Sequence, residues 1–131
     1  MEVCVLASGS RGNSIYVSGG GTSLLVDAGL PARTLTARLR TAGISPGSLR
    51  GVLLTHDHTD HYQGVEVLGR KHALPLFANE GTASGIEARC PKGVFQWQIF
   101  ETASVFEIGG LRVEAFTVSH DAADPVGFVF D

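Results

Sequence analysis

A run of histidines and aspartates stands directly after a short apolar segment and constrains this chain more than any other feature. Three of the five histidines lie within six residues, at His56, His58 and His61. The preceding segment, 52–54, is Val-Leu-Leu, which is typical of a short strand buried on both faces. The fold must therefore place a loop rich in metal-ligand side chains at the end of a buried strand.

The residue types and their spacing in this loop predict a catalytic metal site. Imidazole nitrogens and carboxylate oxygens suit zinc and similar divalent ions. Thr55 ends the strand, so His56 and His58 leave extended backbone two residues apart and point the same way, toward one ion. Asp60 and His61 follow where the chain begins to turn and are expected to serve a second ion. Two ions about 3.5–4 Å apart can share a hydroxide and clamp a reacting ester.

Two other interpretations of the histidine-rich loop stay open. A polar surface loop holds no ligand at all, and a structural zinc site is closed by four protein ligands. Structural zinc sites typically use cysteines, but Cys4 and Cys90 are both far from the loop in sequence. The catalytic interpretation is preferred, and within it Asp57 is expected to support the loop rather than bind metal.

The composition narrows the classes of protein to which the chain can belong. The formal net charge is −3, so there is no global electrostatic argument for a nucleic-acid or membrane partner, although a metal site can hold phosphates. No apolar run approaches membrane-spanning length, and the two cysteines form no CxxC motif. We therefore expect a soluble cytoplasmic protein with no membrane partner and no disulfide framework.

The pattern of apolar residues predicts a mixed α/β chain. Strands are expected at 3–7, 15–17, 22–26, 52–54, 74–77, 94–100, 105–108, 111–118 and 126–130. Helices are expected at 31–42, 64–72 and 80–90. The order of these elements indicates half of a mixed α/β sandwich rather than a doubly wound parallel sheet.

The loop also carries a resemblance to a known family. Residues 55–61, Thr-His-Asp-His-Thr-Asp-His, resemble the HxHxDH signature of the metallo-β-lactamase superfamily of hydrolases. Asp27-Ala28-Gly29 is similar to that superfamily too, which implies that Asp27 ends a strand and braces the metal loop from behind its ligands. His120, followed by Gly127-Phe128, resembles the third motif of the phosphodiesterase members. The resemblance implies that His120 completes the first metal site.

Longer segments narrow the resemblance to one branch of the superfamily. Residues 7–14, 26–29 and 119–128 are similar to the YycJ/WalJ branch, and this resemblance covers essentially the whole chain. It implies a cytoplasmic, metal-dependent exonuclease that acts on DNA from 5′ to 3′. It also implies two divalent ions, zinc or manganese, of which the histidine-rich ligand set favours zinc.

The loop that follows the first predicted strand is a candidate phosphate site. Its glycines let backbone amides approach an anion closely, and Arg11 can pair with a phosphate. The side chains expected to contact phosphate are Ser8, Ser10, Arg11 and Asn13. A tight polar turn without a ligand is the alternative.

The superfamily has further parts for which this sequence offers no candidate. Its members use an aspartate that bridges both ions and a last histidine, but no histidine follows His120 here. Its fold is an αββα sandwich, of which residues 1–131 are expected to be the N-terminal half of a single domain. Half a sandwich would leave an apolar sheet face exposed. We therefore expect either a missing C-terminal half or a second copy of the chain to complete it.

The preferred function is a metal-dependent hydrolase, with a metal-activated water attacking a phosphodiester of DNA. Asp60 is the candidate catalytic residue, because its carboxylate can orient the water and accept its proton. One alternative is a metallohydrolase of small molecules, such as cyclic phosphodiesters, thioesters or lactams, since the same loop serves all of these. Another is a non-catalytic half-domain that only binds a metal or a partner.

Overall fold

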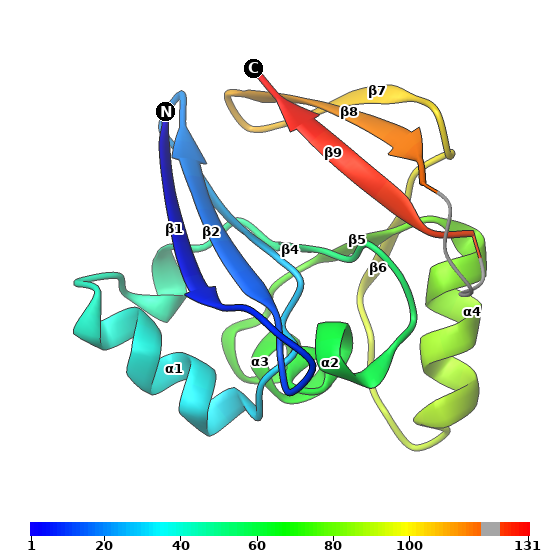
Figure 1. Ribbon diagram of the computed structural model, residues 1–131, viewed down its shortest axis with the longest axis horizontal. Helices are drawn as coiled ribbons and strands as arrows, with labels where there is room; N and C mark the ends of the chain where they lie inside the picture. Colours follow the sequence, from blue (N-terminus) through cyan, green and yellow to red (C-terminus); the bar gives the residue numbers. More distant parts are fainter. Residues whose placement is uncertain (119–123) are drawn as a thin grey trace.

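The chain folds into two β-sheets with helices on one side. The structure is a computed structural model that describes residues 1–118 and 124–131. A six-stranded sheet has the order β1-β2-β3-β4-β5-β6, and a three-stranded sheet has the order β7-β8-β9 (Figure 1). The strands are β1 (Glu2–Ala7), β2 (Ser14–Gly19), β3 (Thr22–Val26), β4 (Val52–Leu53), β5 (Leu76–Ala78), β6 (Trp97–Ile99), β7 (Val105–Ile108), β8 (Leu111–Thr117) and β9 (Val126–Phe130).

The six-stranded sheet changes direction between its two parts. The strands β1, β2 and β3 are antiparallel, whereas β3, β4, β5 and β6 are parallel to one another. Parallel strands need long crossover connections, and here each crossover from β3 onward contains a helix. The helices are α1 (Ala32–Thr41), η1 (Pro46–Ser48), α2 (Thr59–Tyr62), α3 (Val65–His72) and α4 (Glu80–Arg89). No described helix is both long and apolar enough to span a membrane.

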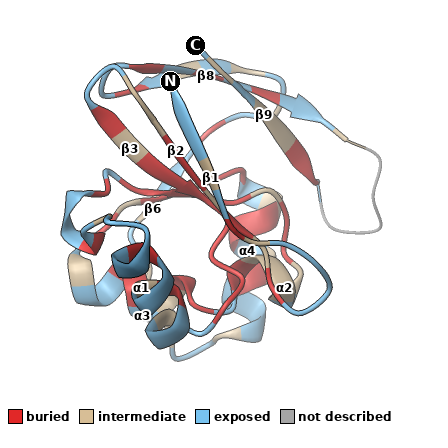
Figure 2. Cartoon of the chain, turned by 60° about the vertical axis from the view of Figure 1, so that its left-hand side comes forward, coloured by how far each residue is buried: buried red, intermediate tan, exposed pale blue. Residues whose placement is uncertain are grey.

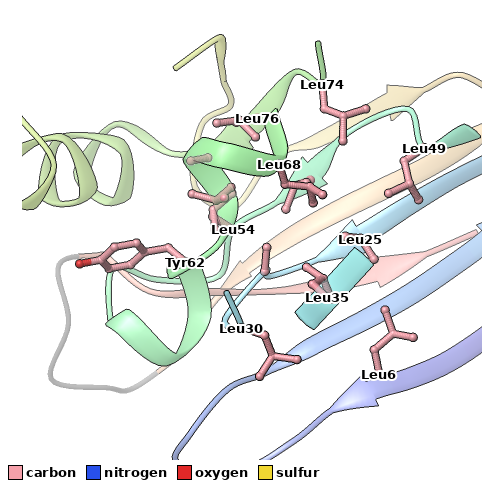
Figure 3. Packing of buried hydrophobic residues seen from close by; sticks show 14 of the residues in the cluster. Leu6, Leu25, Leu30, Leu35, Leu49, Leu54, Tyr62, Leu68, Leu74 and Leu76 are labelled. Carbon is pink, nitrogen blue, oxygen red and sulfur yellow. The ribbon is translucent and has the colours of Figure 1, made fainter. Parts of the chain in front are cut away.

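Two apolar cores lie on either side of the six-stranded sheet, because successive strand side chains point to opposite faces. On β4, Val52 packs against the helices while Leu53 packs against the second sheet. The first core gathers leucines from the helices and the strands beneath them (Figure 3). The second core lies between the two sheets, where Leu24 and Val113 are fully buried. The described residues therefore form three layers, α, β and β (Figure 2).

Two hairpin turns join the sheets at the end remote from the histidine-rich loop. Gly20 and Gly21 turn β2 into β3 with φ of 57° and 76°, a conformation that favours glycine. Gly109 and Gly110 turn β7 into β8, and the Gly110 N–H donates to Thr22 Oγ1 over 2.8 Å. A Cβ on Gly110 would overlap the Gly20 carbonyl. The backbones of the two turns are therefore in direct contact, which is possible because glycine has no Cβ.

The predicted elements are present, and two short helices were not predicted. The helices expected at 31–42, 64–72 and 80–90 correspond to α1, α3 and α4. Residues 59–62, expected in a loop, form α2, and the pattern of the sequence does not predict η1 either. Both are a single turn long, so a helical period of apolar residues cannot show in them.

Candidate metal centre

The histidine-rich loop leaves the carboxyl end of β4, in the middle of the parallel part of the sheet. Val26 of β3 pairs with Leu53 of β4 in parallel register, so the residues that follow both strands meet at the same edge. Asp27 follows β3, and Thr55 opens the loop after β4. Their side chains are in contact, because Thr55 Oγ1 donates to Asp27 Oδ2 over 2.7 Å. The sheet topology therefore brings together residues that are 28 positions apart in sequence.

The imidazole rings of the loop lie side by side. The ring centroids of His56 and His61 are 3.8 Å apart, and those of His56 and His58 are 4.9 Å apart. The helix α2 begins immediately after His58 and turns the chain back, which brings His61 onto His56. The spacing along the chain predicts that His56 and His58 converge, but it does not predict the close approach of His61 to His56.

Asp27 holds the loop through three hydrogen bonds. Its buried carboxylate accepts the Thr55 N–H over 2.8 Å, the Thr55 hydroxyl over 2.7 Å and His61 Nδ1 over 2.6 Å. Its backbone has a φ of 64°, a left-handed conformation that aspartate tolerates better than most side chains. A carboxylate on the far nitrogen of a histidine is the usual support of a metal ligand, since it fixes the tautomer. Asp27 thus contacts the loop directly, and its expected role behind a metal ligand stays a prediction.

Thr55 extends this support to a second histidine and was missed by the sequence analysis. Its hydroxyl lies 2.8 Å from His56 Nδ1. The hydroxyl has one hydrogen and donates it to Asp27, so His56 Nδ1 must donate to the Thr55 oxygen. In their neutral forms, His56 and His61 both therefore carry the lone pair on Nε2. Imidazole nitrogens that present a lone pair are the donor chemistry of a zinc site.

Asn13 supports the carboxylate side of the loop. Its side-chain amide donates to the carbonyl and to Oδ2 of Asp60, both over 3.2 Å, and to the Gly9 carbonyl over 2.8 Å. Its backbone N–H donates to the Asp60 carbonyl over 2.8 Å. A Cβ on Gly29 would overlap that same carbonyl. The loop at 8–14 therefore fixes Asp60 through side chain and backbone, a role beyond the phosphate contact expected for Asn13.

Asp57 is tied to α4 by a residue that sequence analysis did not single out. Arg89 Nη1 donates to the Asp57 carboxylate over 2.8 Å and to the Asp57 carbonyl over 2.5 Å. A Cβ at Gly85, one turn earlier on α4, would overlap the same carboxylate. The ion pair between Asp57 and Arg89 fixes the backbone between His56 and His58, which is how Asp57 supports the loop.

A cavity of about 410 Å³ opens beside the loop. Its lining residues are Ser10, Arg11, Asp57, His58, Thr59, Asp60, Gln63 and Arg89. Two of the expected phosphate contacts, Ser10 and Arg11, thus face the candidate metal loop across an open space. Ser8 lines a different cavity, of about 340 Å³, together with Asp27, Thr55 and His61.

The remaining expected metal ligand lies outside the described residues. His120 belongs to 119–123, and the expectation that it binds the first ion stays a prediction. Among residues 1–118 and 124–131, no group of three or more His, Cys, Asp or Glu side chains is arranged to hold a metal ion. The described part of the chain therefore contains hydrogen-bonded ligand candidates but no complete metal site.

The pKa of His61 lies above its ordinary value of 6.5. Burial of the ring is the largest single influence and lowers the pKa, but other influences together outweigh it. These are the hydrogen bond to Asp27 and the negative charges of Asp27 and Asp60. A metal ion has to displace the proton that this environment retains, so metal binding should release protons.

We expect the metal-free protein to lose stability as the pH rises through the raised pKa of His61. The stabilisation that the protonated His61 ring gives the folded state is complete below pH 6.5, where the ring is protonated in both the folded and the unfolded state. It is lost as the pH rises above the pKa that His61 has in the folded state. Asp27→Asn removes one of the two negative charges that raise the pKa of His61 and should flatten this slope. Urea unfolding of the chelated protein and of the variant, at a series of pH values on both sides of 6.5, measures the difference. An equal slope in both proteins would contradict the assignment.

Comparison with known protein families places the chain in one superfamily. Residues 22–131 match the family described as the beta-lactamase superfamily domain, and the chain belongs to this superfamily. It is similar in structure to a B3 metallo-β-lactamase with an active-site glutamic acid, with a TM-score of 0.82 at 19% identity over 98% of this chain and 53% of that one. The Rm3 metallo-β-lactamase has a TM-score of 0.80 at 19% identity, over 98% of this chain and 53% of that one. At this identity the likeness establishes the fold alone, and it confirms the expected half of a metallo-β-lactamase fold.

Sequence relatives give a narrower placement. The chain is 43% identical to exodeoxyribonuclease YycJ of Bacillus anthracis, over 99% of this chain and 50% of the relative. It is 41% identical to exodeoxyribonuclease WalJ of Streptococcus pneumoniae, over 96% of this chain and 48% of the relative. The resemblance to this branch is thereby confirmed. The chain spans about half the length of the curated relatives it matches.

Proposed function

We propose that this chain supplies the metal-binding half of a hydrolase that degrades DNA from an end. The observation that carries the proposal is the histidine-rich loop at the end of β4, with His61 held by Asp27 and Asp60 held by Asn13. Relatives at 41–43% identity are named exodeoxyribonucleases, which favours DNA as the substrate. We also propose that residues 1–131 form the N-terminal half of one domain.

The proposed ligands divide between two ions. His56, His58 and His120 would hold the first, and Asp60 and His61 would contribute to the second. Histidine-rich ligand sets favour zinc over manganese. When bound, the ions lower the pKa of a water molecule and neutralise charge on the phosphate oxygens.

The residues of the chain then act on the substrate and on the water. Asp60 orients the attacking water and accepts its proton, and Asn13 keeps the Asp60 carboxylate in place for this role. Asp27 and Thr55 keep His61 and His56 in the tautomer that presents Nε2. Ser10 and Arg11 line the cavity beside the loop and donate to phosphate oxygens of the DNA.

A small-molecule metallohydrolase is the second candidate. The fold is shared with metallo-β-lactamases, and the net charge of −3 favours no polyanion. The sequence identity of the exodeoxyribonuclease relatives, more than twice that of these lactamases, makes DNA the preferred substrate.

Both described cysteines, Cys4 and Cys90, are unpaired, and we propose the cytoplasm as the location.

The test is an assay of the full-length gene product with and without its metal. We expect bound zinc or manganese by elemental analysis and stepwise shortening of DNA oligonucleotides labelled at either end. Chelation should abolish the shortening, and added metal should restore it. Activity that survives chelation would rule out the proposal. Hydrolysis of a β-lactam or a thioester, with none of DNA, would favour the second candidate.

A further inference from the structure

The cavity beside the metal loop has a guanidinium group on each of two separate segments. Arg11 comes from the loop between β1 and β2, and Arg89 comes from the last turn of α4. The metal-loop residues His58 and Asp60 line the same space. We propose that Arg11 and Arg89 together bind a second phosphate of the DNA, the one next to the phosphate that is cleaved. This inference rests on the proposed function.

Both arginines have hydrogen-bonding capacity left for a ligand. Arg11 makes no hydrogen bond or ion pair with any residue in the described ranges. Arg89 uses only Nη1 on Asp57, and 49% of its side chain is exposed. Its Nε and Nη2 groups have no acceptor among the described residues. A guanidinium presents five N–H donors in a planar fork that matches phosphate oxygens, so both residues can still donate.

The other charges in the cavity favour an anion that approaches from the arginine side. Asp57 is neutralised by its ion pair with Arg89, and Asp60 is a proposed metal ligand. Among the described residues that line the cavity, Arg11 then remains as an uncompensated cation, and Ser10, Thr59 and Gln63 add polar groups. The cavity volume of about 410 Å³ lies within the range of about 300–1,000 Å³ that is usual for ligand sites. A phosphate held there would place its neighbour close to the metal loop.

The test compares two substrates in the full-length, metal-loaded gene product. A DNA oligonucleotide has neighbouring phosphates, whereas bis(p-nitrophenyl) phosphate has only the one that is cleaved. In Arg11→Ala, the ratio of kcat/KM for the oligonucleotide to that for the small ester should fall about tenfold or more, since a charge-assisted hydrogen bond to the second phosphate is lost. The slope of log KM against log salt concentration should also fall by about 0.7, as for one lost contact to single-stranded DNA.

A matched control separates this effect from the general loss of a surface charge. Arg112 also pairs with a carboxylate, on Asp131, and its side chain is likewise 49% exposed, but it lies on β8. Arg112→Ala should leave the ratio unchanged. Arg89→Ala should lower the ratio too, and it should also lower turnover of both substrates because Asp57 loses its partner. Arg11→Ala, which removes no hydrogen bond or ion pair between described residues, therefore decides the question.

The outcomes distinguish this inference from the proposed function. An unchanged ratio in Arg11→Ala, in an enzyme that still degrades DNA, overturns the second phosphate site and leaves the proposed function intact. Failure of the unmodified enzyme to act on DNA overturns both. Oligonucleotides with a 5′-phosphate or a 5′-hydroxyl identify the source of the phosphate. An Arg11 effect only with the 5′-phosphate indicates the terminal group, and an equal effect indicates an internal one.

Discussion

The largest expected effect is that His58→Ala removes more than about a hundredfold of the DNA-degrading activity of the full-length gene product. Loss of a group that merely supports a metal ligand typically costs 10–100-fold in affinity or activity, and loss of a ligand should cost more. His58 precedes α2 and makes no side-chain cap on it, so the helix should persist. Kinetic assays, with metal content measured on the same samples, check the prediction.

His72 provides the matched histidine control for this variant. It lies at the end of α3, and the proposed function gives it no role. His72→Ala should retain both the metal and the activity. A His58→Ala protein that keeps its full metal content and turnover would remove His58 from the ligand set. A parallel loss in both variants would show that the assay reports folding rather than ligation.

The second large effect is on folding, and it comes from a glycine. Gly29→Ala should lower the free energy of unfolding by about 3 kcal/mol or more, at the upper end of the usual cost of overpacking. The added Cβ would overlap the Asp60 carbonyl and lie 2.7 Å from the backbone nitrogen of Asn13. Neither atom can move without breaking the hydrogen bonds that join the loop at 8–14 to the metal loop. Urea unfolding monitored by circular dichroism measures the loss.

Gly47→Ala is the control for the added methyl group. Its Cβ would meet only Ser45 Oγ, at 3.9 Å, and the residue lies in the short helix η1 on the surface. Its free energy of unfolding should change by no more than about 0.5 kcal/mol. A Gly29→Ala protein as stable as Gly47→Ala would contradict the prediction and show that the backbone at Asp60 can yield to an added methyl group. Metal affinity should also fall in Gly29→Ala, because Asp60 is displaced. It should stay unchanged in Gly47→Ala.

Features that depend on neighbouring residues could be predicted from the sequence. The apolar run before Thr55, the helical spacing in α1 and the paired glycines at hairpin turns each show within a few positions, and the structure has these elements. The metal-ligand candidates were predicted for the same reason, since four of them lie between His56 and His61. The order of strands and helices then sufficed for the class of fold.

Contacts across long distances in the sequence were decided only by the tertiary structure. Arg89 reaches Asp57 over 32 positions because α4 packs against the loop, and no local pattern marks either residue as the partner of the other. Likewise, α2 is a single turn, too short for a period, yet it brings His61 onto His56. Local spacing specifies which residue types lie near one another along the chain, whereas the packing of sheet and helices selects which side chains meet.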